Sequence, residues 1–600
     1  MLTPPIPVAL PLFTAALLAG LNRRIPARLS AALAIAATLA VGYAAALLAA
    51  GAGSAAPVYW FGGWSVRGGQ AVGIAFVPDA AGPILVLAAS VLMTASLVFS
   101  LEYFDTVGTL YHSLMLAFLA ALSGFSLTGD LFNLFVFFEL MSAAAFALCG
   151  YKSDEAGPLE GALNFAVTNA IGAFLVLSGI GLLYGRTGAL NLAQMGRRLA
   201  GPPDALVTCA LAFIVCGFFV KAAIVPFHFW LADAHTVAPA PVCVLFSGIM
   251  VPLGLYAVVR VYWSVFSGAM GPEVNGWRNL LAAMGAMTAL AGALMCYLQR
   301  NLKRLLAFST IGHMGLLLLG IALLTPAGLG GASIYLLGHG LVKGGLFLAA
   351  GILLHRTSSV DELELAVMRR RLRWIAALLI PGAAGLAGLP PFATFRGGQM
   401  IGGSARLLGY GWMDWVEFAV AAATAGAVLR FTGRALFHLG PVEEVVGERG
   451  SDIAEEPDTE GGHRRTPAVM TVSAAALILA GAALGLAPHL TGAAQAAAIG
   501  IEDRAAYARR VLDAAPPRPP AIADEPSTAG DFGRGSGAFG AALLLAAGTL
   551  GSARLRRAVA PLRPMLHAVR RLHSGIIPDY VAWLVFGVAA FGAALWLMAR

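Results

Sequence analysis

The chain has 600 residues, of which 59% are hydrophobic and only 12% are charged, and its mean hydropathy is +0.79. Soluble domains carry about 25% charged residues, so this composition excludes a soluble globular protein and indicates a protein whose solvent is the bilayer. The formal net charge is +8, but the basic residues cluster in short loops between apolar stretches. That is the positive-inside pattern of membrane proteins, which points to lipid and not to nucleic acid as a partner.

Apolar stretches of membrane length run through the whole chain. A spanning helix needs about 20 mostly apolar residues, and roughly sixteen stretches meet that measure. We therefore predict an all-α polytopic membrane protein, with the first stretch kept as a helix because it lacks the basic start of a signal peptide. In chain order the stretches lie near residues 3–21, 29–51, 81–101, 112–129, 131–150, 160–184, 205–226, 237–264, 277–298, 304–324, 330–354, 372–408, 415–438, 467–488, 537–553 and 578–598.

Sixteen spans also predict an orientation. With both termini outside a prokaryotic cytoplasmic membrane, the main basic clusters fall on the cytoplasmic side. These clusters lie near residues 23–28, 300–304, 369–373 and 554–571.

Two spans contain an ionisable residue. Glu139 lies within DLFNLFVFFELMSAAAFAL, and Lys221 lies within CALAFIVCGFFVKAAIVPFHFW. A charge at the bilayer centre costs at least about 2.5 kcal/mol, and such residues usually mark ion pathways. The alternative for Lys221 is that it only extends toward the interface. Its position deep in its span, just before Pro226, favours a pathway role.

Prolines interrupt the apolar pattern at two places. Pro226, Pro239 and Pro241 follow Lys221 closely, and AGLPPFATFRGGQM interrupts the long stretch at residues 387–400. Proline removes a backbone donor from a helix, and irregular backbone at membrane depth is tolerated only where protein or water shelters it. Two broken helices, five helices apart, predict two inverted five-helix repeats at residues 112–265 and 277–438.

The rest of the chain flanks these repeats. Residues 1–111 are expected to form N-terminal transmembrane helices, 439–466 an acidic cytoplasmic loop, and 467–600 further helices. That last region includes a linker at 514–536 and a basic segment at 554–575, which is either interfacial or an ordinary charged loop. No metal-binding or cofactor-binding motif occurs, and the five cysteines lack CxxC spacing, so no cofactor is expected in this chain.

Five motifs resemble one family of membrane subunits. They are DLFNLFVFFEL, FVKAAIVPFHFWLADAHTVAPAPV, LKRLLAFSTIGHMG, LGHGLVKGGLFLAAG and GLPPFATF, in order between about residues 100 and 410. They are similar to the antiporter-like subunits shared by respiratory complex I, Mrp cation/proton antiporters and membrane-bound hydrogenases. The closing LHSGIIPDYVAWLVFG also resembles the end of longer members.

The resemblance implies a proton-translocating subunit with a hydrated axis in mid-membrane. Glu139 and Lys221 match the central ion pair of the family, and His339 and Lys343 match the helix that leads to the second half. His339 and Lys343 are four residues apart and so share a helix face. The further candidates for a proton relay are His228, His235, His313 and Arg396.

Departures from the family pattern keep a second interpretation open. Pro252 stands where relatives commonly place a lysine or histidine, and Arg396 to Gln399 stand where they carry a lysine or glutamate. Arginine cannot readily shuttle protons. The chain is therefore expected either to move protons, or sodium, within a multisubunit membrane complex, or to be a scaffold that has lost transport and anchors other subunits.

Overall fold

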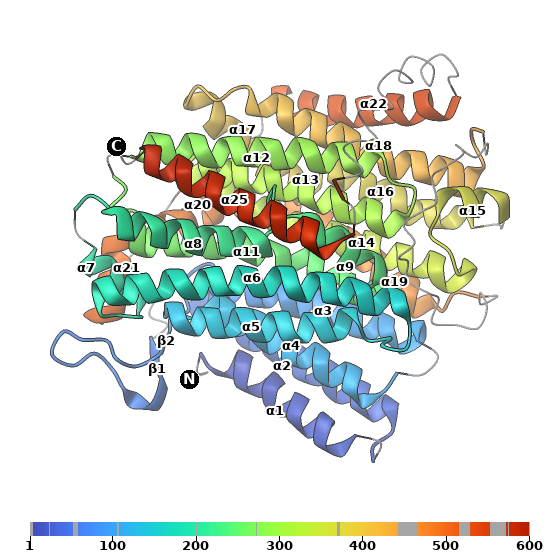
Figure 1. The fold of residues 1–600 in the computed structure, drawn as a ribbon. Coiled ribbons are helices and arrows are strands. Elements are labelled where there is room, and N and C mark those ends of the chain that lie inside the picture. The colour runs from blue at the N-terminus through green and yellow to red at the C-terminus, as the bar shows by residue number, and fades with distance from the viewer. Residues whose placement is uncertain are drawn as a thin grey trace.

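The computed structural model describes residues 4–22, 24–51, 58–104, 107–199, 201–271, 273–368, 372–441, 465–514, 522, 529–551, 572–573 and 575–598. Within these ranges the chain is almost wholly helical (Figure 1), which confirms the all-α membrane class. Most of the acidic loop at 439–466 lies outside the described residues. The same is true of most of the basic segment at 554–575 and of most of the first half of the linker at 514–536.

Twelve helical stretches of the described residues are long and apolar enough to cross a membrane. Helices span membranes because they satisfy every backbone polar group internally. The twelve stretches are α2 (Ala27–Gly51), α3 (Gly82–Tyr103), α4 (Thr109–Leu127), α5 (Leu131–Cys149), α6 (Ala156–Thr187), the continuous stretch Ala240–Phe266, α12 (Val274–Tyr297), α13 (Leu302–Ala322), α14 (Pro326–Thr357), α18 (Met413–Phe437), α19 (Ala468–Gly485) and α25 (Ile577–Met598).

Twelve of the sixteen expected spans meet this measure of length and hydropathy among the described residues. Three expected spans are shorter apolar helices, namely α1 (Ile6–Leu21), α8 (Ala205–Lys221) and the stretch Arg373–Leu386 that contains α16 (Ala376–Leu386). The long stretch 372–408 divides, since α17 (Ala393–Leu407) begins only after a gap. The stretch 537–553 lies mainly in α22 (Ala529–Gly551), whose glycines dilute its apolar character.

Shorter elements also occur in the described part of the chain. Helices α7 (Leu192–Arg198) and α15 (Glu362–Met368) lie at opposite ends of the bundle in Figure 1. The stretch Ala240–Phe266 consists of α10 (Ala240–Leu245), a π-helical turn at Phe246–Met250, α11 (Val251–Val261) and a second π-helical turn. The others are α9 (Phe229–Val237), α20 (Leu490–Glu502), α21 (Arg504–Leu512) and an antiparallel ribbon of β1 (Tyr59–Trp60) and β2 (Ala75–Phe76).

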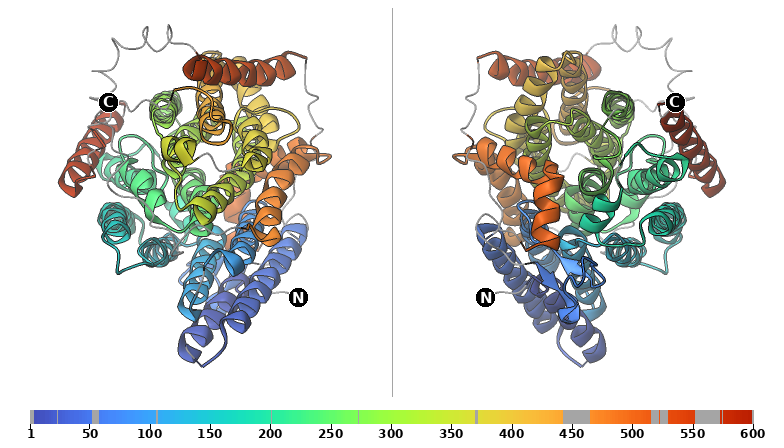
Figure 2. Two further views of the ribbon diagram at one scale, coloured as in Figure 1. Left: turned by 90° about the vertical axis from the view of Figure 1, so that its right-hand side faces the viewer. Right: turned by 90° about the vertical axis from the view of Figure 1, so that its left-hand side faces the viewer.

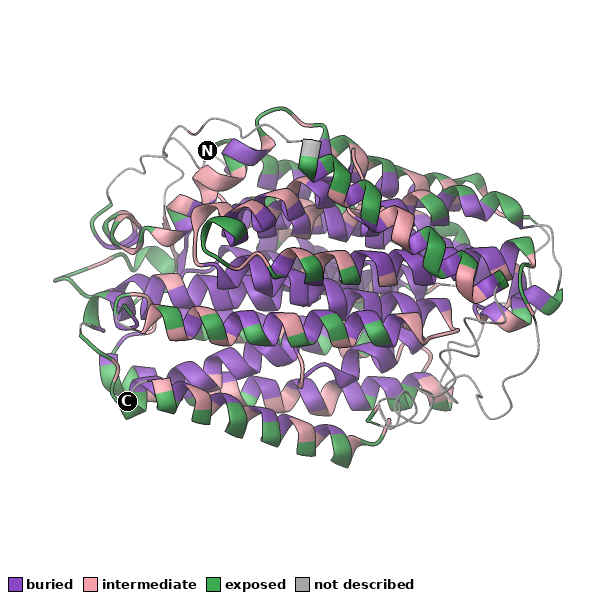
Figure 3. Ribbon diagram, turned by 90° about the horizontal axis from the view of Figure 1, so that it is seen from above, coloured by how far each residue is buried: buried purple, intermediate pink, exposed green. Residues whose placement is uncertain are grey.

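The centre of the bundle is formed by α13, α14 and the stretch Ala240–Phe266. The most apolar 18-residue segments of α13 and of Ala240–Phe266 are completely buried, whereas only 22% of the corresponding segment of α25 is buried. In Figure 3 the buried residues accordingly fill the middle and the exposed ones follow the outer helix faces. Seen along the bundle (Figure 2), the N-terminal helices and α22 lie at opposite edges, and α25 packs on a third side.

Candidate functional site

Lys221 lies at the last residue of α8 and is 0% exposed. Asp204 precedes the helix and caps its start by accepting a hydrogen bond from the Val207 amide, and the helix stops before the Pro226 turn. The Lys221 ammonium donates to Ser142 Oγ at 2.6 Å and lies 4.4 Å from the centre of the Phe138 ring. Among the described residues it forms no ion pair, so a hydroxyl and an aromatic face hold the charge.

Glu139 lies on α5, three residues before Ser142, but its side chain is on the exposed face of that helix. Asp130 caps the start of α5 by accepting from the Asn133 amide at 2.8 Å. The described residues contain no ion pair of Glu139, so Glu139 and Lys221 lie near each other without direct contact. Ser142 connects the α5 backbone to the lysine, because its Oγ also donates to the Phe138 carbonyl.

His235 of α9 is 0% exposed, and neither ring nitrogen has a hydrogen-bond partner among the described residues. Its ring stacks on Phe347 of α14 at 4.8 Å and lies 5.9 Å from the Phe246 ring. Phe165 contacts Phe246 at 5.7 Å and lies 5.8 Å from the Lys221 ammonium. Two phenylalanine rings therefore stand between Lys221 and His235.

The second group of polar residues lies on α13 and α14. Lys343 is 0% exposed and donates from Nζ to the Leu306 carbonyl at 2.7 Å. One turn earlier on α14, His339 is also 0% exposed, and its ring centre lies 4.9 Å from that of His313 on α13. The structure thus brings His313, His339 and Lys343 together, as the sequence predicted for the last two.

Hydroxyl groups extend this second group in two directions. His313 Nδ1 lies 2.7 Å from the Tyr335 hydroxyl, and Nε2 lies 3.3 Å from Thr424 Oγ1. On the other side, Thr310 Oγ1 donates to the Leu306 carbonyl that also accepts from Lys343, and it lies 2.6 Å from Ser247 Oγ. A chain of polar groups therefore runs from Ser247 to Tyr335.

Sequence reasoning missed these hydroxyl residues. Ser247 lies in the π-helical turn Phe246–Met250, a distortion that often accompanies functional sites. The available signal was spacing, because Thr310 precedes His313 by three residues and Tyr335 precedes His339 by four, which places each pair on one helix face.

His228, at the start of α9, lies in a separate cluster against α25. Its Nε2 is 3.0 Å from Nε2 of His573, and the Tyr580 hydroxyl donates to Asp233 at 2.6 Å. Asp233 also lies 3.6 Å from Arg304. The segment that ends in α25 therefore covers the turn between α8 and α9 with its own polar groups.

Arg396 and Pro252 lie outside both groups. Arg396 Nε donates to the carbonyl of Gly485 at the end of α19, at 3.3 Å. Pro252 is the second residue of α11, directly after the π-helical turn Phe246–Met250. The structure does not bring Arg396 to the other candidate residues.

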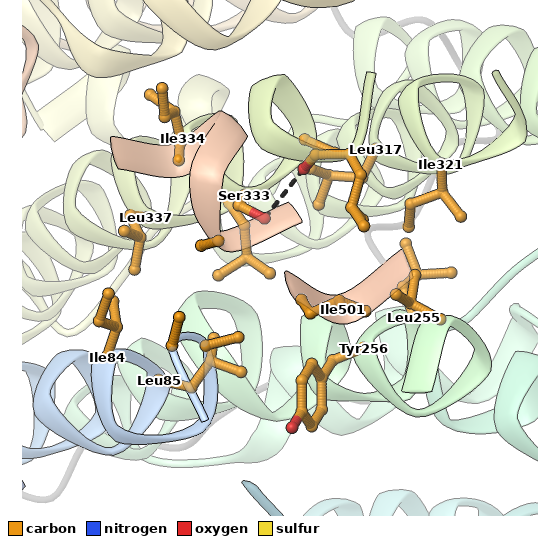
Figure 4. A pocket seen from close by; sticks show the side chains of 18 of the residues that line it. Ile84, Leu85, Leu255, Tyr256, Leu317, Ile321, Ser333, Ile334, Leu337 and Ile501 are labelled. Carbon is orange, nitrogen blue, oxygen red and sulfur yellow. Dashed lines mark hydrogen bonds between the residues drawn. The ribbon is translucent and has the colours of Figure 1, made fainter. Parts of the chain in front are cut away.

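A cavity of about 160 Å³ lies between α3, α11, α13, α14 and α20 (Figure 4). Its wall is almost entirely aliphatic, and the Ser333 hydroxyl in it donates to the Leu329 carbonyl. Tyr256 also borders it, but its hydroxyl donates to the Ser126 carbonyl. The cavity offers no charged ligand to an ion, so the candidate path lies in the lysine and histidine groups and not here.

A protein-family model described as "NADH:quinone oxidoreductase/Mrp antiporter, TM" matches residues 128–423. This range contains every candidate residue predicted from the sequence, from Glu139 to Arg396. Comparison with curated proteins finds similarity to several subunits of that family.

NADH-quinone oxidoreductase subunit N of Desulforudis audaxviator is 35% identical over 286 residues, which are 48% of this chain and 56% of the relative. NADH-quinone oxidoreductase subunit N 2 of Roseiflexus castenholzii is 31% identical over 366 residues, 58% of this chain and 72% of the relative. The chain thus spans between about half and three quarters of the length of these relatives.

The fold is similar to a chain in the structure of the Mrp complex from Dietzia sp. The TM-score is 0.73 at 26% sequence identity, and the match covers 85% of this chain and 99% of that chain. The similarity therefore extends beyond the segment matched by the family model, into the helices on both sides of it.

Proposed function

This chain belongs to the NADH:quinone oxidoreductase/Mrp antiporter transmembrane family, and from that premise we propose that it translocates protons, or exchanges a cation for protons, as a membrane subunit of a multisubunit complex. The observation that carries the proposal is the set of ionisable side chains inside the bundle. Each of them is 0% exposed: Lys221, His235, His313, His339 and Lys343.

The hydrogen-bond partners of the two buried lysines are uncharged, which is compatible with proton transfer. Lys221 and Lys343 donate to a serine hydroxyl and to a backbone carbonyl, with no carboxylate in ion-pair distance among the described residues. A buried lysine amine can give up and take back a proton, unlike a guanidinium group. The rings of His313 and His339 offer further donor and acceptor nitrogens next to Lys343.

The exposed position of Glu139 supports membership in a larger assembly. A carboxylate on the outer face of a membrane-spanning helix would meet lipid, which is costly. A neighbouring subunit that covers this face of α5 would shelter Glu139 and could change its charge. We infer that Glu139 couples Lys221 to that neighbour, whether the complex is of the quinone reductase, hydrogenase or Mrp kind.

Two inverted repeats, at residues 112–265 and 277–438, form part of the proposal. Helices α6 and α14 are both 32 residues long, and each is followed by a left-handed residue, Gly188 or Ser358, and then by a seven-residue helix. Because a repeat of five crossings ends on the opposite side, the second copy would run inverted.

The backbone at the two helix interruptions supports the same repeat. Ala223 after α8 and Gly388 after α16 both have positive φ, at 52° and 64°. In both places the next amide, of Ile224 or Leu389, donates to the carbonyl five residues earlier at 3.0 Å. Lys221 and Leu386 end the corresponding helices, so only the first interruption carries a lysine.

The orientation of the termini also stays a proposal. Helix α1 begins and α25 ends toward the same end of the bundle in Figure 1, which supports two termini on one side. The Arg300–Asp361 pair lies by α15 at the other end, and the positive-inside rule assigns that end to the cytoplasm.

The experiment is a Glu139→Gln variant of the complete complex reconstituted in liposomes. Since Glu139 lies on an exposed helix face, the variant should assemble, and proton uptake should fall by at least about tenfold. Glu160→Gln, which changes an exposed carboxylate on α6, is the matched control. Unchanged proton and sodium transport by assembled Glu139→Gln complex would contradict this role.

The scaffold alternative has one observation in its favour. Arg396 contacts the end of α19 and does not face the histidines. The family pattern has a titratable residue in this region, whereas Arg396 here connects α17 to α19. A complex that transports neither protons nor cations, yet loses companion subunits when this chain is removed, would favour the scaffold.

A further inference from the structure

A carboxylate from α18 occupies the space that Gly398 leaves open on α17. Gly398 is buried, and a Cβ placed on it would overlap the carboxylate of Glu417. All three nearest atoms belong to that carboxyl group. The missing side chain on α17 is thus replaced, in the same place, by an acidic side chain of the neighbouring helix.

Toward the centre of the bundle, Glu417 is next to the histidine group. Glu417 and Tyr335 line one small cavity of about 10 Å³ between α13, α14, α17 and α18. The Tyr335 hydroxyl lies 2.7 Å from His313 Nδ1, and the ring of His313 lies beside that of His339. Tyr335 therefore stands between Glu417 and the residues that lead to Lys343.

Away from the centre, Glu417 borders a second cavity of about 40 Å³ whose polar wall is formed by Gln399, Asp414, Asp531 and Arg534. A polar cavity of this size can hold water. Asp531 is held by Gln399 at 2.9 Å and by Arg534, whose side chain is 40% exposed. The cavity thus adjoins a charged cluster that reaches the molecular surface.

The charges of that cluster are largely compensated without Glu417. Arg406 pairs with Asp414 at 2.8 Å and lies 3.8 Å from Asp531. Among the described residues Glu417 forms no ion pair. Glu417 is a half-buried residue that lines both cavities, so its carboxylate can accept a proton on one side and release it on the other.

We propose that Glu417 is the terminal proton-exchange residue of the second half of the path, in place of a titratable side chain on α17. The assignment rests on the proposed proton-translocating function. A proton passes from His313 to the Tyr335 oxygen as a water in the small cavity that Tyr335 and Glu417 both line takes the Tyr335 hydroxyl proton and gives one of its own protons to the Glu417 carboxylate. The resulting carboxylic acid then gives its proton to water in the outer cavity, which regenerates the carboxylate.

Two residues of this exit, Asp531 and Arg534, come from α22, which lies outside the segment 128–423 that the family model matches. Asp531 accepts a hydrogen bond from Gln399, and both residues line the outer cavity. The exit therefore combines a helix of the common segment with a helix of the C-terminal region.

The test measures proton transport by the complete complex in liposomes. Glu417→Gln should lower the rate by at least about tenfold, the scale of a lost general acid or base, and Glu417→Asp should retain part of it. Glu102→Gln, an exposed carboxylate on α3, is the matched control and should leave the rate unchanged. Wild-type transport by Glu417→Gln overturns the assignment.

A relocation variant separates the role of the carboxylate from packing. Gly398→Glu combined with Glu417→Gly returns the same carboxylate to the same space from α17, and it should restore transport relative to Glu417→Gln. Should Glu417→Gln fail to assemble, an assembled but inactive relocation variant overturns the assignment. A wild-type complex without any proton transport would remove the proposed function itself, and this assignment with it.

Discussion

Ser142 is the residue through which α5 holds the lysine of α8. It is the hydrogen-bond acceptor of the Lys221 ammonium, at 2.6 Å. Hydrogen bonds to charged groups contribute about 1.5–3 kcal/mol, so Ser142→Ala should slow proton transport by about tenfold without preventing assembly. The control is Ser178→Ala, an exposed serine of α6 that bonds only to its own helix. Equal rates for the two variants would exclude this role of Ser142.

Glu502, at the end of α20 and outside the membrane-spanning segments, predicts a pH effect on stability. Burial raises the pKa of Glu502 from 4.5 to about 8, and Oε1 has no hydrogen-bond partner among the described residues. The folded protein therefore binds the proton more tightly than the unfolded chain does. Stability from this site is fully present below pH 4.5 and is lost as the pH rises to about 8, since folding then requires a buried charge.

The variant Glu502→Gln should remove that dependence. Thermal unfolding of the purified protein in detergent would be followed at about pH 5 and about pH 8, and the wild type should lose more stability between them than the variant does. Asp154→Asn, an exposed carboxylate before α6, should behave like the wild type. The same pH slope in both variants would show that Glu502 does not titrate in this range.

Only part of the candidate site was predictable at the level of residues. The lysines and the histidine of α14 are conspicuous in apolar helices, because a charge there needs a reason. Ser142 and Tyr335 are not conspicuous in the sequence, because a hydroxyl group can form its hydrogen bond within its own helix. Ser142 does so by donating to the Phe138 carbonyl. The contact between Gly398 of α17 and Glu417 of α18 is visible only in the structure, because nothing in the sequence relates these two positions.

Helix α25 packs across the turn between α8 and α9 at a glycine. Gly587 lies against Pro226 and Phe227, and a Cβ there would come within 2.6–2.8 Å of their side chains. Overpacking costs typically about 1–3 kcal/mol, so Gly587→Leu should lower the stability of the purified protein by about that amount. It should also increase proteolysis before α25, because the Tyr580–Asp233 bond would be strained.

Gly592 on the same helix provides the control. Nothing lies within 4 Å of a Cβ placed there, so Gly592→Leu should change neither the thermal stability nor the pattern of proteolysis. If both variants unfolded like the wild type, α25 would not be docked at Gly587. Hydropathy alone predicted that α25 spans a membrane, but not which helix it covers, because a lipid-facing helix pattern contains little information about its neighbour.

At the scale of the whole molecule, the exposed face of α5 predicts a subunit contact. Val136, one turn from Glu139, is 43% exposed. A photo-reactive amino acid at this position should crosslink to a companion subunit in the complete complex, and to lipid when the chain is produced alone. Lipid adducts in both preparations would indicate that no protein covers Glu139.

The membrane class of the whole chain was predictable because it depends on composition, and the apolar stretches of the sequence located the long helices correctly. The lengths of the shorter helices were not predictable, because hydropathy does not detect where a helix stops. Residues 372–408 read as one stretch, but α16 ends at Leu386 and α17 starts at Ala393. Contacts between distant segments, such as Asn164 with the carbonyl of Gly575 at 3.0 Å, also leave no periodic signal.

The place where α8 ends has one more consequence. Aligned peptide dipoles give the carboxyl end of a helix about half a negative charge, and Lys221 lies in the last turn of α8. The backbone itself thus acts as a partial counter-ion that no side-chain substitution removes. An ammonium at Lys221 would keep this support after Glu139 is neutralised, so folding and charge at Lys221 can persist while the coupling to a neighbour is lost.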